Sequence, residues 1–386
     1  MRSLMIYNAM IMPVNSLPMK GNVIIEDGKI AHIFGGTPTH ISDDDIDAKG
    51  NILMPGLIDI HTHMGFIGDG AGDEGIDVNE GSSPVTPQLR AIDGINYFDG
   101  YFKDAVKAGI TTVITGVGSL NAIGGSMIAV KTGCRYLDEA LIDTVGIKFA
   151  LGENPKSYYA ERDEAPQTRM ATAALIRETL YKAKQYAEQK RSAEEPSDLP
   201  DFDLKYEALI PLLEGKLKAH IHCHRADDIL TALRLCEEFS LTPLLIHCTE
   251  GHLIADILAK KGAEAVVGPV ICDRGKPEMA HASLENAAKL SRAGVKLAIC
   301  TDHPEVQIDF LAASAAFCVK HGLPHDTAIR ALTLTAAELG GFADRCGSVE
   351  AGKDADLIIL SGDPLDINTD VLLTMVNGET VYDKLR

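Results

Sequence analysis

The sequence predicts an α/β protein, a (β/α)8 barrel of the TIM type with a small β-domain built from both chain ends. Three observations support this. Short apolar runs alternate with helical stretches through the middle of the chain, as in βα units around a parallel sheet. Both ends instead contain short strands joined by tight turns. Residues that can bind metals follow several of the apolar runs, as at the active face of a barrel.

The chain ends are predicted to fold together. In residues 1–55, Asp27-Gly28 stands between two apolar runs and is typical of a β-hairpin turn. The last segment has the same character, with a strand at 355–360 and a second hairpin turn at Asn377-Gly378. We therefore assign 1–55 and 345–386 to one composite β-domain and 56–344 to the barrel.

Eight apolar runs in the middle of the chain match the number that such a barrel requires. They are residues 57–60, 111–115, 127–131, 145–151, 218–222, 243–247, 265–271 and 296–300. Helical patterns lie between them, for instance at 228–239, 253–260 and 283–293. The segment 160–215 interrupts this alternation of strands and helices, and contains a predicted helix at 171–189. It is predicted to be a helical insertion on the surface, with a lid or a dimer contact as the alternative.

Composition restricts the partners and the location. A chain of 386 residues with 46% hydrophobic residues suits a large globular domain with an appendage. The net charge of −19 argues against nucleic acid or an anionic membrane as partner. No apolar run reaches the length of a membrane span, and the first twenty residues do not resemble a signal peptide. The eight scattered cysteines indicate reduced thiols. We expect a cytoplasmic protein that acts on a small molecule, and a homo-oligomer is left open.

Two glycine-rich segments follow predicted strands and should lie at the active face of the barrel. They are residues 68–81 and 115–125. The first does not have the spacing of an EF-hand loop, and the second lacks the Gly-Lys-Ser/Thr ending of a phosphate-binding loop. Neither therefore predicts calcium or nucleotide binding.

A His-X-His pair ends the first barrel strand, in Leu57-Ile-Asp-Ile-His-Thr-His63. Side chains alternate along a strand, so His61 and His63 point the same way and can share one metal ion. Three other strands end in residues of the same type: His220-Ile-His-Cys-His224, His247 and Asp302. In a barrel these ends meet at one face, and imidazole and carboxylate groups suit zinc, iron or manganese.

These motifs resemble the amidohydrolase superfamily, in its imidazolonepropionase-like and prolidase-like branch. The resemblance runs almost from end to end. The matching stretches are Met54-Pro-Gly-Leu-Ile-Asp-Ile-His-Thr-His63, Ala108-Gly-Ile-Thr-Thr-Val113, His222-Cys-His-Arg-Ala-Asp-Asp-Ile229, Ile246-His-Cys-Thr-Glu250, Cys300-Thr-Asp-His303 and Gly347-Ser-Val-Glu-Ala-Gly-Lys-Asp-Ala-Asp-Leu357. The resemblance implies a distorted barrel and a β-sandwich built from both chain ends.

The resemblance also implies a metal site with one or two divalent ions per chain, zinc first, with manganese or iron as alternatives. His61 and His63 would bind the more buried ion, and His222 and His247 the second. Asp302 would contact the first ion and the attacking water, and would act as general base and then as general acid.

Two neighbouring residues are expected on the substrate side of this site. His224 would face the substrate. Arg225 could hold a substrate carboxylate, although an exposed arginine is more often a solvated charge.

A bridging anion between two ions would come from the fourth strand, where Lys148 and Glu153 are the alternatives. They have opposite parity along the strand, so a regular strand aims only one of them inward. Lys148 could ligate only after carboxylation by carbon dioxide, whereas Glu153 needs no modification. We favour Glu153 here, although Ile147-Lys-Phe-Ala150 resembles strands whose lysine is carboxylated.

The predicted reaction is hydrolysis of a C–N bond, in a cyclic amide or an acyl-amine, by metal-activated water. A metallo-dipeptidase or a deaminase with the same residues is the alternative enzyme. A metal-binding protein without catalysis is the remaining alternative.

Overall fold

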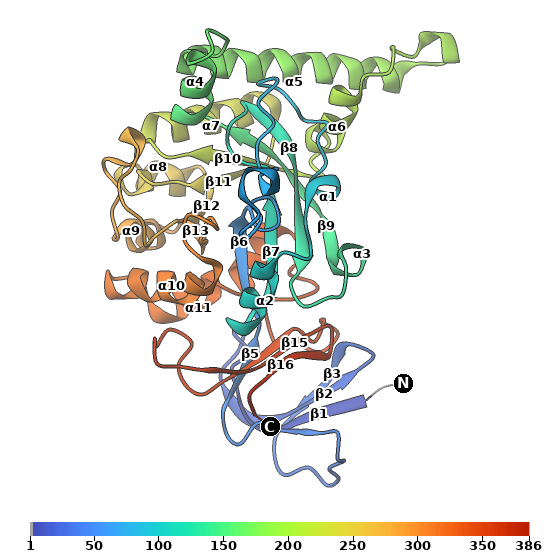
Figure 1. Ribbon diagram of the computed structural model, residues 1–386, viewed down its shortest axis with the longest axis vertical. Coiled ribbons are helices and arrows are strands. Elements are labelled where there is room, and N and C mark those ends of the chain that lie inside the picture. Colours follow the sequence, from blue (N-terminus) through green and yellow to red (C-terminus); the bar gives the residue numbers. More distant parts are fainter. Residues whose placement is uncertain (1–2, 386) are drawn as a thin grey trace.

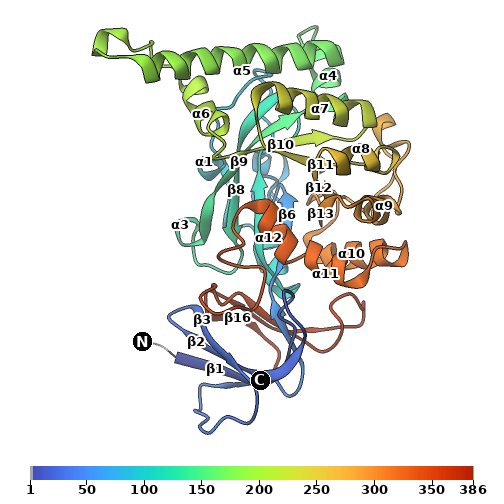
Figure 2. The ribbon, with the colours of Figure 1, turned by 180° about the vertical axis from the view of Figure 1, so that it is seen from behind.

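The structure is a computed structural model that describes residues 3–385 and contains two eight-stranded sheets (Figure 1). Residues 1, 2 and 386 of the predicted composite domain lie outside the described residues. One sheet comes from the middle of the chain and curves into a nearly closed barrel. The other comes from both chain ends and lies at one end of the molecule (Figures 1 and 2). The predicted fold class is confirmed.

The barrel strands are neighbours in chain order, and each predicted run forms one of them. They are β6 (Leu57–Thr62), β7 (Ile110–Gly116), β8 (Ile123–Lys131), β9 (Leu141–Ala150), β10 (Lys218–Cys223), β11 (Pro243–His247), β12 (Glu264–Val267) and β13 (Lys296–Ile299). β12 ends before the predicted residue 271. Gly268 follows it with φ +150°, and a Cβ there would lie 2.2 Å from the carbonyl oxygen of Cys300.

The direction of β8 differs from the prediction of βα units throughout. β8 pairs antiparallel with both β7 and β9, whereas the other neighbouring strands are parallel. The physical reason is the length of the connection. A parallel return needs a crossover of about a dozen residues or more, and only residues 117–122 join β7 to β8. The chain therefore turns back directly.

Helices cover the outside of the barrel and extend it at one end. They are α1 (Ala91–Gly94), α2 (Gly100–Lys107), α3 (Leu137–Ala140), α4 (Glu153–Ala160), α5 (Arg169–Ser192), α6 (Leu204–Leu213), α7 (Ala226–Phe239), α8 (Ala255–Lys260), α9 (Asn286–Ala293), α10 (Leu311–Lys320), α11 (His325–Ala331) and α12 (Leu334–Gly340). The long α5 belongs to the predicted insertion and lies at the end of the molecule far from the chain-end sheet (Figure 1). No helix among residues 3–385 is long and apolar enough to cross a membrane.

The barrel closes where β6 meets the segment that follows β13. The buried carboxylate of Asp59 accepts hydrogen bonds from the Thr301 hydroxyl at 2.6 Å and from the Thr301 amide at 3.1 Å. Two backbone bonds follow. The amide of Asp302 donates to the carbonyl of His61 at 3.2 Å, and the amide of His63 donates to the carbonyl of His303 at 2.8 Å. The first and last barrel strands are thereby fixed in register beside each other.

The chain-end sheet has the order β16-β15-β14-β5-β1-β2-β3, with β4 paired to β1. Its strands are β1 (Ser3–Ile11), β2 (Met19–Glu26), β3 (Lys29–Phe34), β4 (Ile46–Asp47), β5 (Ile52–Pro55), β14 (Leu357–Leu360), β15 (Val371–Val376) and β16 (Glu379–Asp383). Both predicted hairpins form. Asp27-Gly28 and Asn377-Gly378 have positive φ at both residues, as a tight two-residue turn requires.

A buried lysine joins the barrel to this sheet. Lys131, the last residue of β8, is only 1% exposed. Its Nζ lies 2.8 Å from Asp354 Oδ2, 2.5 Å from Asp356 Oδ2 and 2.9 Å from Asn377 Oδ1. Burial disfavours the charged form, but the two aspartates outweigh it and raise the pKa of Lys131. The lysine therefore stays charged and holds both partners.

We predict that Lys131→Met lowers the free energy of unfolding by about 3–5 kcal/mol, because it leaves the buried carboxylate of Asp356 without its cation. Urea denaturation measures this change. Lys29→Met is the matched control, since Lys29 pairs with the same Asp354 from an exposed position and is expected to cost about 1 kcal/mol or less. Equal losses in the two variants would contradict the role given to Lys131.

Candidate metal centre

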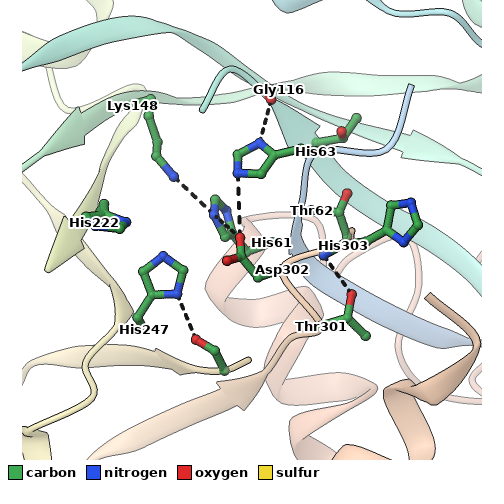
Figure 3. Close-up of polar contacts among 12 residues, drawn as sticks. His61, Thr62, His63, Gly116, Lys148, His222, His247, Thr301, Asp302 and His303 are labelled. Atoms are coloured by element: carbon green, nitrogen blue, oxygen red, sulfur yellow. Dashed lines mark hydrogen bonds and ion pairs between the residues drawn. The ribbon is translucent and has the colours of Figure 1, made fainter. Parts of the chain in front are cut away.

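The ligand-type residues predicted at the ends of β6 and β13 come together at the mouth of the barrel (Figure 3). His61 Nε2 lies 3.4 Å from Asp302 Oδ1, and His63 Nε2 lies 3.5 Å from the same oxygen. His61 and Asp302, together with His247, offer ligand atoms that lie within 4.8 Å of one another. This is the first of two donor groups in the site.

The second donor group comes from β10 and β11. His222, His224 and His247 also offer ligand atoms within 4.8 Å of one another. The parallel register that pairs Cys223 with His247 brings the two strand ends side by side. The ring of His224 stacks on that of His247, with centroids 4.5 Å apart and planes 5° apart. His247 belongs to both groups, so the two groups are adjacent.

Backbone carbonyl groups orient two of these rings. His63 Nδ1 donates to the carbonyl of Gly116 at 2.9 Å, and His247 Nδ1 donates to the carbonyl of Gly268 at 2.7 Å. A carbonyl oxygen only accepts hydrogen bonds, so Nδ1 carries the proton in each ring. The lone pair of each is therefore on Nε2, the atom that faces the centre of the site.

The backbone itself turns sharply at two of the donors. His247 has φ +70° and Asp302 has φ +55°, a left-handed conformation that costs energy for residues other than glycine. His247 is the last residue of β11, and Asp302 follows β13 by three residues; both side chains lie at the barrel mouth. The strain is therefore located at two of the candidate metal ligands.

Burial keeps the imidazoles neutral. It lowers the pKa of His61, His222 and His247 well below the usual value, and that of His63 to about 3. Burial likewise lowers the pKa of His224 to about 4, although the neighbouring Glu278 opposes this. At neutral pH each ring keeps a free lone pair, which is the form that binds metal ions.

Lys148 reaches the middle of the site from β9. It is fully buried, and its Nζ lies 3.0 Å from His61 Nε2 (Figure 3). Burial lowers the pKa of Lys148 to about 8, and the charge of Asp302 opposes that shift. Burial raises the pKa of Asp302 above its usual value, and Lys148 in turn opposes that rise.

A cavity of about 290 Å³ opens above the donors, a size that suits a small molecule. Both glycine-rich segments contribute to its wall, through Val78 and Asn79 from the first and Gly118 and Ser119 from the second. Both segments therefore lie at the mouth of the barrel, beside the candidate ligands. Lys276 is the only lysine or arginine among the described residues that line the cavity.

Comparison with known proteins places the chain in a family. The sequence profile described as "Amidohydrolase family" matches residues 52–381. The chain belongs to the amidohydrolase family. This confirms the family expected from the motifs.

Similar proteins agree with this assignment. The crystal structure of an amidohydrolase from Thermotoga maritima MSB8 has a TM-score of 0.95 and 37% identity, covering 98% of this chain and 100% of that one. Amidohydrolase tasK of Hapsidospora irregularis is 27% identical over 94% of this chain, which matches 40% of the length of tasK. The imidazolonepropionase of Bacteroides fragilis is 22% identical, with 87% of this chain and 84% of the relative covered.

Two predicted site residues lie away from the donors of this amidohydrolase. Glu153 is the first residue of α4, and its Oε2 accepts a hydrogen bond from the backbone amide of Glu278 at 3.3 Å. Among the described residues it belongs to neither donor group. Arg225 makes two hydrogen bonds to Asp227, at 3.0 and 2.8 Å, and does not line the cavity.

Sequence reasoning missed three polar residues near the site: Asn154 at the start of α4, and Lys276 and Glu278 in the segment after β12. Lys276 donates to Asn154 Oδ1 at 3.1 Å, and Asn154 Nδ2 lies 3.5 Å from His222 Nε2. Glu278 approaches His222 and His224. No strand-end pattern marks these residues. The only available signal was that loops after barrel strands line the active face.

The donors fit a divalent ion by their own chemistry. Two buried carboxylate oxygens that face these imidazoles, Asp302 Oδ1 and Glu278 Oε1, have no hydrogen-bond partner among residues 3–385. Leaving such atoms unsatisfied is costly. Neutral imidazoles and a carboxylate gathered in this way are the ligand types that zinc, manganese and iron prefer. The structure therefore contains histidine and aspartate groups that could hold a metal.

We predict that the protein, purified without chelator, carries one or two divalent ions per chain, and that His222→Gln binds fewer ions than the wild type. Elemental analysis measures both. His32→Gln is the control, because His32 is exposed on β3 in the other sheet. Wild-type protein that stays free of metal after incubation with zinc would rule out the metal centre.

Proposed function

We propose that this amidohydrolase hydrolyses a C–N bond at a carbonyl-type carbon, in a cyclic amide or an acyl-amine, with a divalent metal bound at the barrel mouth. The observation that carries the proposal is the convergence of His61, His63 and Asp302 with the histidines of β10 and β11 beside one cavity. The family membership and the imidazolonepropionase relatives support it.

The residues divide into two ligand sets. His61, His63 and Asp302 would hold the first ion, and His222, His224 and His247 the second. We therefore propose His224 as a ligand; it also lines the cavity, so its predicted place beside the substrate stays a prediction. When bound, such ions polarise a carbonyl group and lower the pKa of water. Zinc suits these donors best, with manganese or iron as alternatives.

Asp302 is the proton carrier in this proposal. Its Oδ1 has no hydrogen-bond partner within the described chain and lies at the cavity wall. It accepts the proton of the attacking water and returns it to the leaving nitrogen, as general base and then general acid. The left-handed backbone of Asp302 and the bond from its amide to the His61 carbonyl fix the carboxylate for both transfers.

For the bridging position we propose Lys148 rather than Glu153. Lys148 Nζ lies 3.0 Å from His61 Nε2, whereas Glu153 is engaged with the loop that carries Glu278. An ammonium group has no lone pair, so Lys148 would ligate as its carboxylated form.

One lysine in the cavity offers a place for a free carboxylate on the substrate, although Asp273 and Glu305 also line the wall. Lys276 lines the cavity and is partly buried there, so it could pair with a carboxylate group. This observation favours N-acyl amino acids, dipeptides and carboxylate-bearing cyclic amides. It keeps the metallo-dipeptidase as the second candidate function.

A hydrolysis screen with zinc or manganese added tests the proposal. It should contain N-acyl amino acids, dipeptides and cyclic amides, each with and without a free carboxylate. Turnover of a cyclic amide or an acyl-amine supports the proposal. Turnover of dipeptides alone would favour the metallo-dipeptidase, and ammonia release would favour a deaminase. Metal-loaded protein without any turnover would contradict an enzymatic role.

We predict that Asp302→Asn lowers kcat by at least about 100- to 10,000-fold while the protein stays folded, because the amide keeps the shape of the side chain and cannot accept the proton. Steady-state kinetics and circular dichroism measure the two effects. Asp309→Asn is the control, since Asp309 is exposed in the same segment. A kcat near the wild-type value would remove Asp302 from the mechanism.

We further predict that Lys148→Ala loses metal while Glu153→Gln retains it, with bicarbonate supplied to both proteins. Glutamine still offers the oxygen that accepts the Glu278 amide, so the α4 turn should persist. Elemental analysis reads out metal content, and the intact mass of the wild type should rise by one carbon dioxide. The reverse pattern of metal loss, with no added mass, would restore Glu153 as the bridging residue.

A further inference from the structure

Glu278 is a buried carboxylate that no part of the proposed mechanism uses. It lies in a short turn, Pro277–Met279, of the loop between β12 and α9, and it is 1% exposed. Its Oε2 accepts a hydrogen bond from the backbone amide of Glu153 at 2.8 Å. Its Oε1 is buried and has no hydrogen-bond partner among residues 3–385. One oxygen is thus satisfied and the other is open.

The open oxygen faces the second donor group. Glu278 Oε1 lies 3.7 Å from His222 Nε2 and 3.8 Å from His224 Nε2. These separations are too long for hydrogen bonds. They are close to the spacing of two ligands on one ion, because donors at about 2.0–2.2 Å from a tetrahedral zinc lie about 3.3–3.6 Å apart.

The surrounding chain is shaped to hold this carboxylate in place. Gly152 has φ +86°, and a Cβ at that position would lie 2.6 Å from Glu278 Oε2. Glu153 and Glu278 also brace each other, since each side chain accepts the other's backbone amide. The turn between β9 and α4 therefore fixes a residue that is 125 positions away in the chain.

We propose that Glu278 is a ligand of the ion held by His222, His224 and His247. This inference rests on the proposed function for the presence of that ion and adds a donor to it. It gives the second ion three imidazoles and a carboxylate. It also ties the loop after β12, which forms part of the cavity wall through Cys272, Asp273 and Lys276, to the metal centre.

Glu278→Gln tests the inference through metal affinity rather than activity. Glutamine keeps the oxygen that accepts the Glu153 amide and removes the negative charge. Competition with a chromogenic zinc chelator should show two ions in the wild type. In the variant, one of them should bind about 100-fold more weakly or worse, because even residues that only support a ligand contribute 10- to 100-fold. Glu285→Gln is the control, an exposed glutamate of the same loop.

The outcomes separate this inference from the proposed function. If the wild type and Glu278→Gln bind both ions with equal affinity, Glu278 is no ligand and the metal-dependent hydrolase still stands. If the wild type binds no ion, the proposed function fails and this inference fails with it. Loss of one ion in Glu278→Gln, with Glu285→Gln unchanged, supports the inference.

A measurement on the wild type covers the case in which Glu278→Gln does not fold. Hydrogen–deuterium exchange is compared in chelator-treated protein with and without added zinc. Ligation by Glu278 predicts that zinc slows exchange in peptides covering residues 272–282 as well as at the ends of β10 and β11. Slowing at β10 and β11 with no change at 272–282 would overturn the inference.

Discussion

The seam between the first and last barrel strands is the constraint on which the site depends. Asp59 receives two hydrogen bonds from Thr301, and the backbone bonds of His61 and His63 to Asp302 and His303 continue the same seam. Residues about 240 positions apart in sequence are thereby neighbours. Without this closure, the His-X-His pair and the carboxylate would belong to separate ends of an open sheet, and no shared donor group would exist.

The second donor group depends on a different constraint, the parallel register of β10 and β11. That register places His222 beside Ile246 and Cys223 beside His247. The histidines of the two strands therefore lie within one residue of each other along the strand direction. Ile221 alternates with His220 and His222 and joins the apolar cluster that contains Ile229 of α7. One face of β10 therefore packs against helices, while the other carries imidazoles.

Local sequence patterns predicted the parts of this protein that local physics determines. The eight barrel runs, the turns at Asp27-Gly28 and Asn377-Gly378, and the strand-end donors could each be recognised from a few neighbouring residues. The direction of β8 depends on the length of the 117–122 connection. The choice between Lys148 and Glu153 depends on contacts with His61 and Glu278, which are distant in sequence. Glu278 itself stands in a polar loop whose sequence carries no mark of burial.

The pairing of β5 with β14 has a consequence for how the protein is made. Pro55 of β5 lies opposite Leu357 of β14, roughly 300 residues later in the chain. During synthesis on a ribosome, the edge of β5 that pairs with β14 is therefore unpaired when it emerges. It stays unpaired until β14 has been synthesised. Lys131 also lacks its carboxylate partners until then, since Asp354 and Asp356 lie late in the chain. These contacts can therefore form only after residues 354–360 have been synthesised.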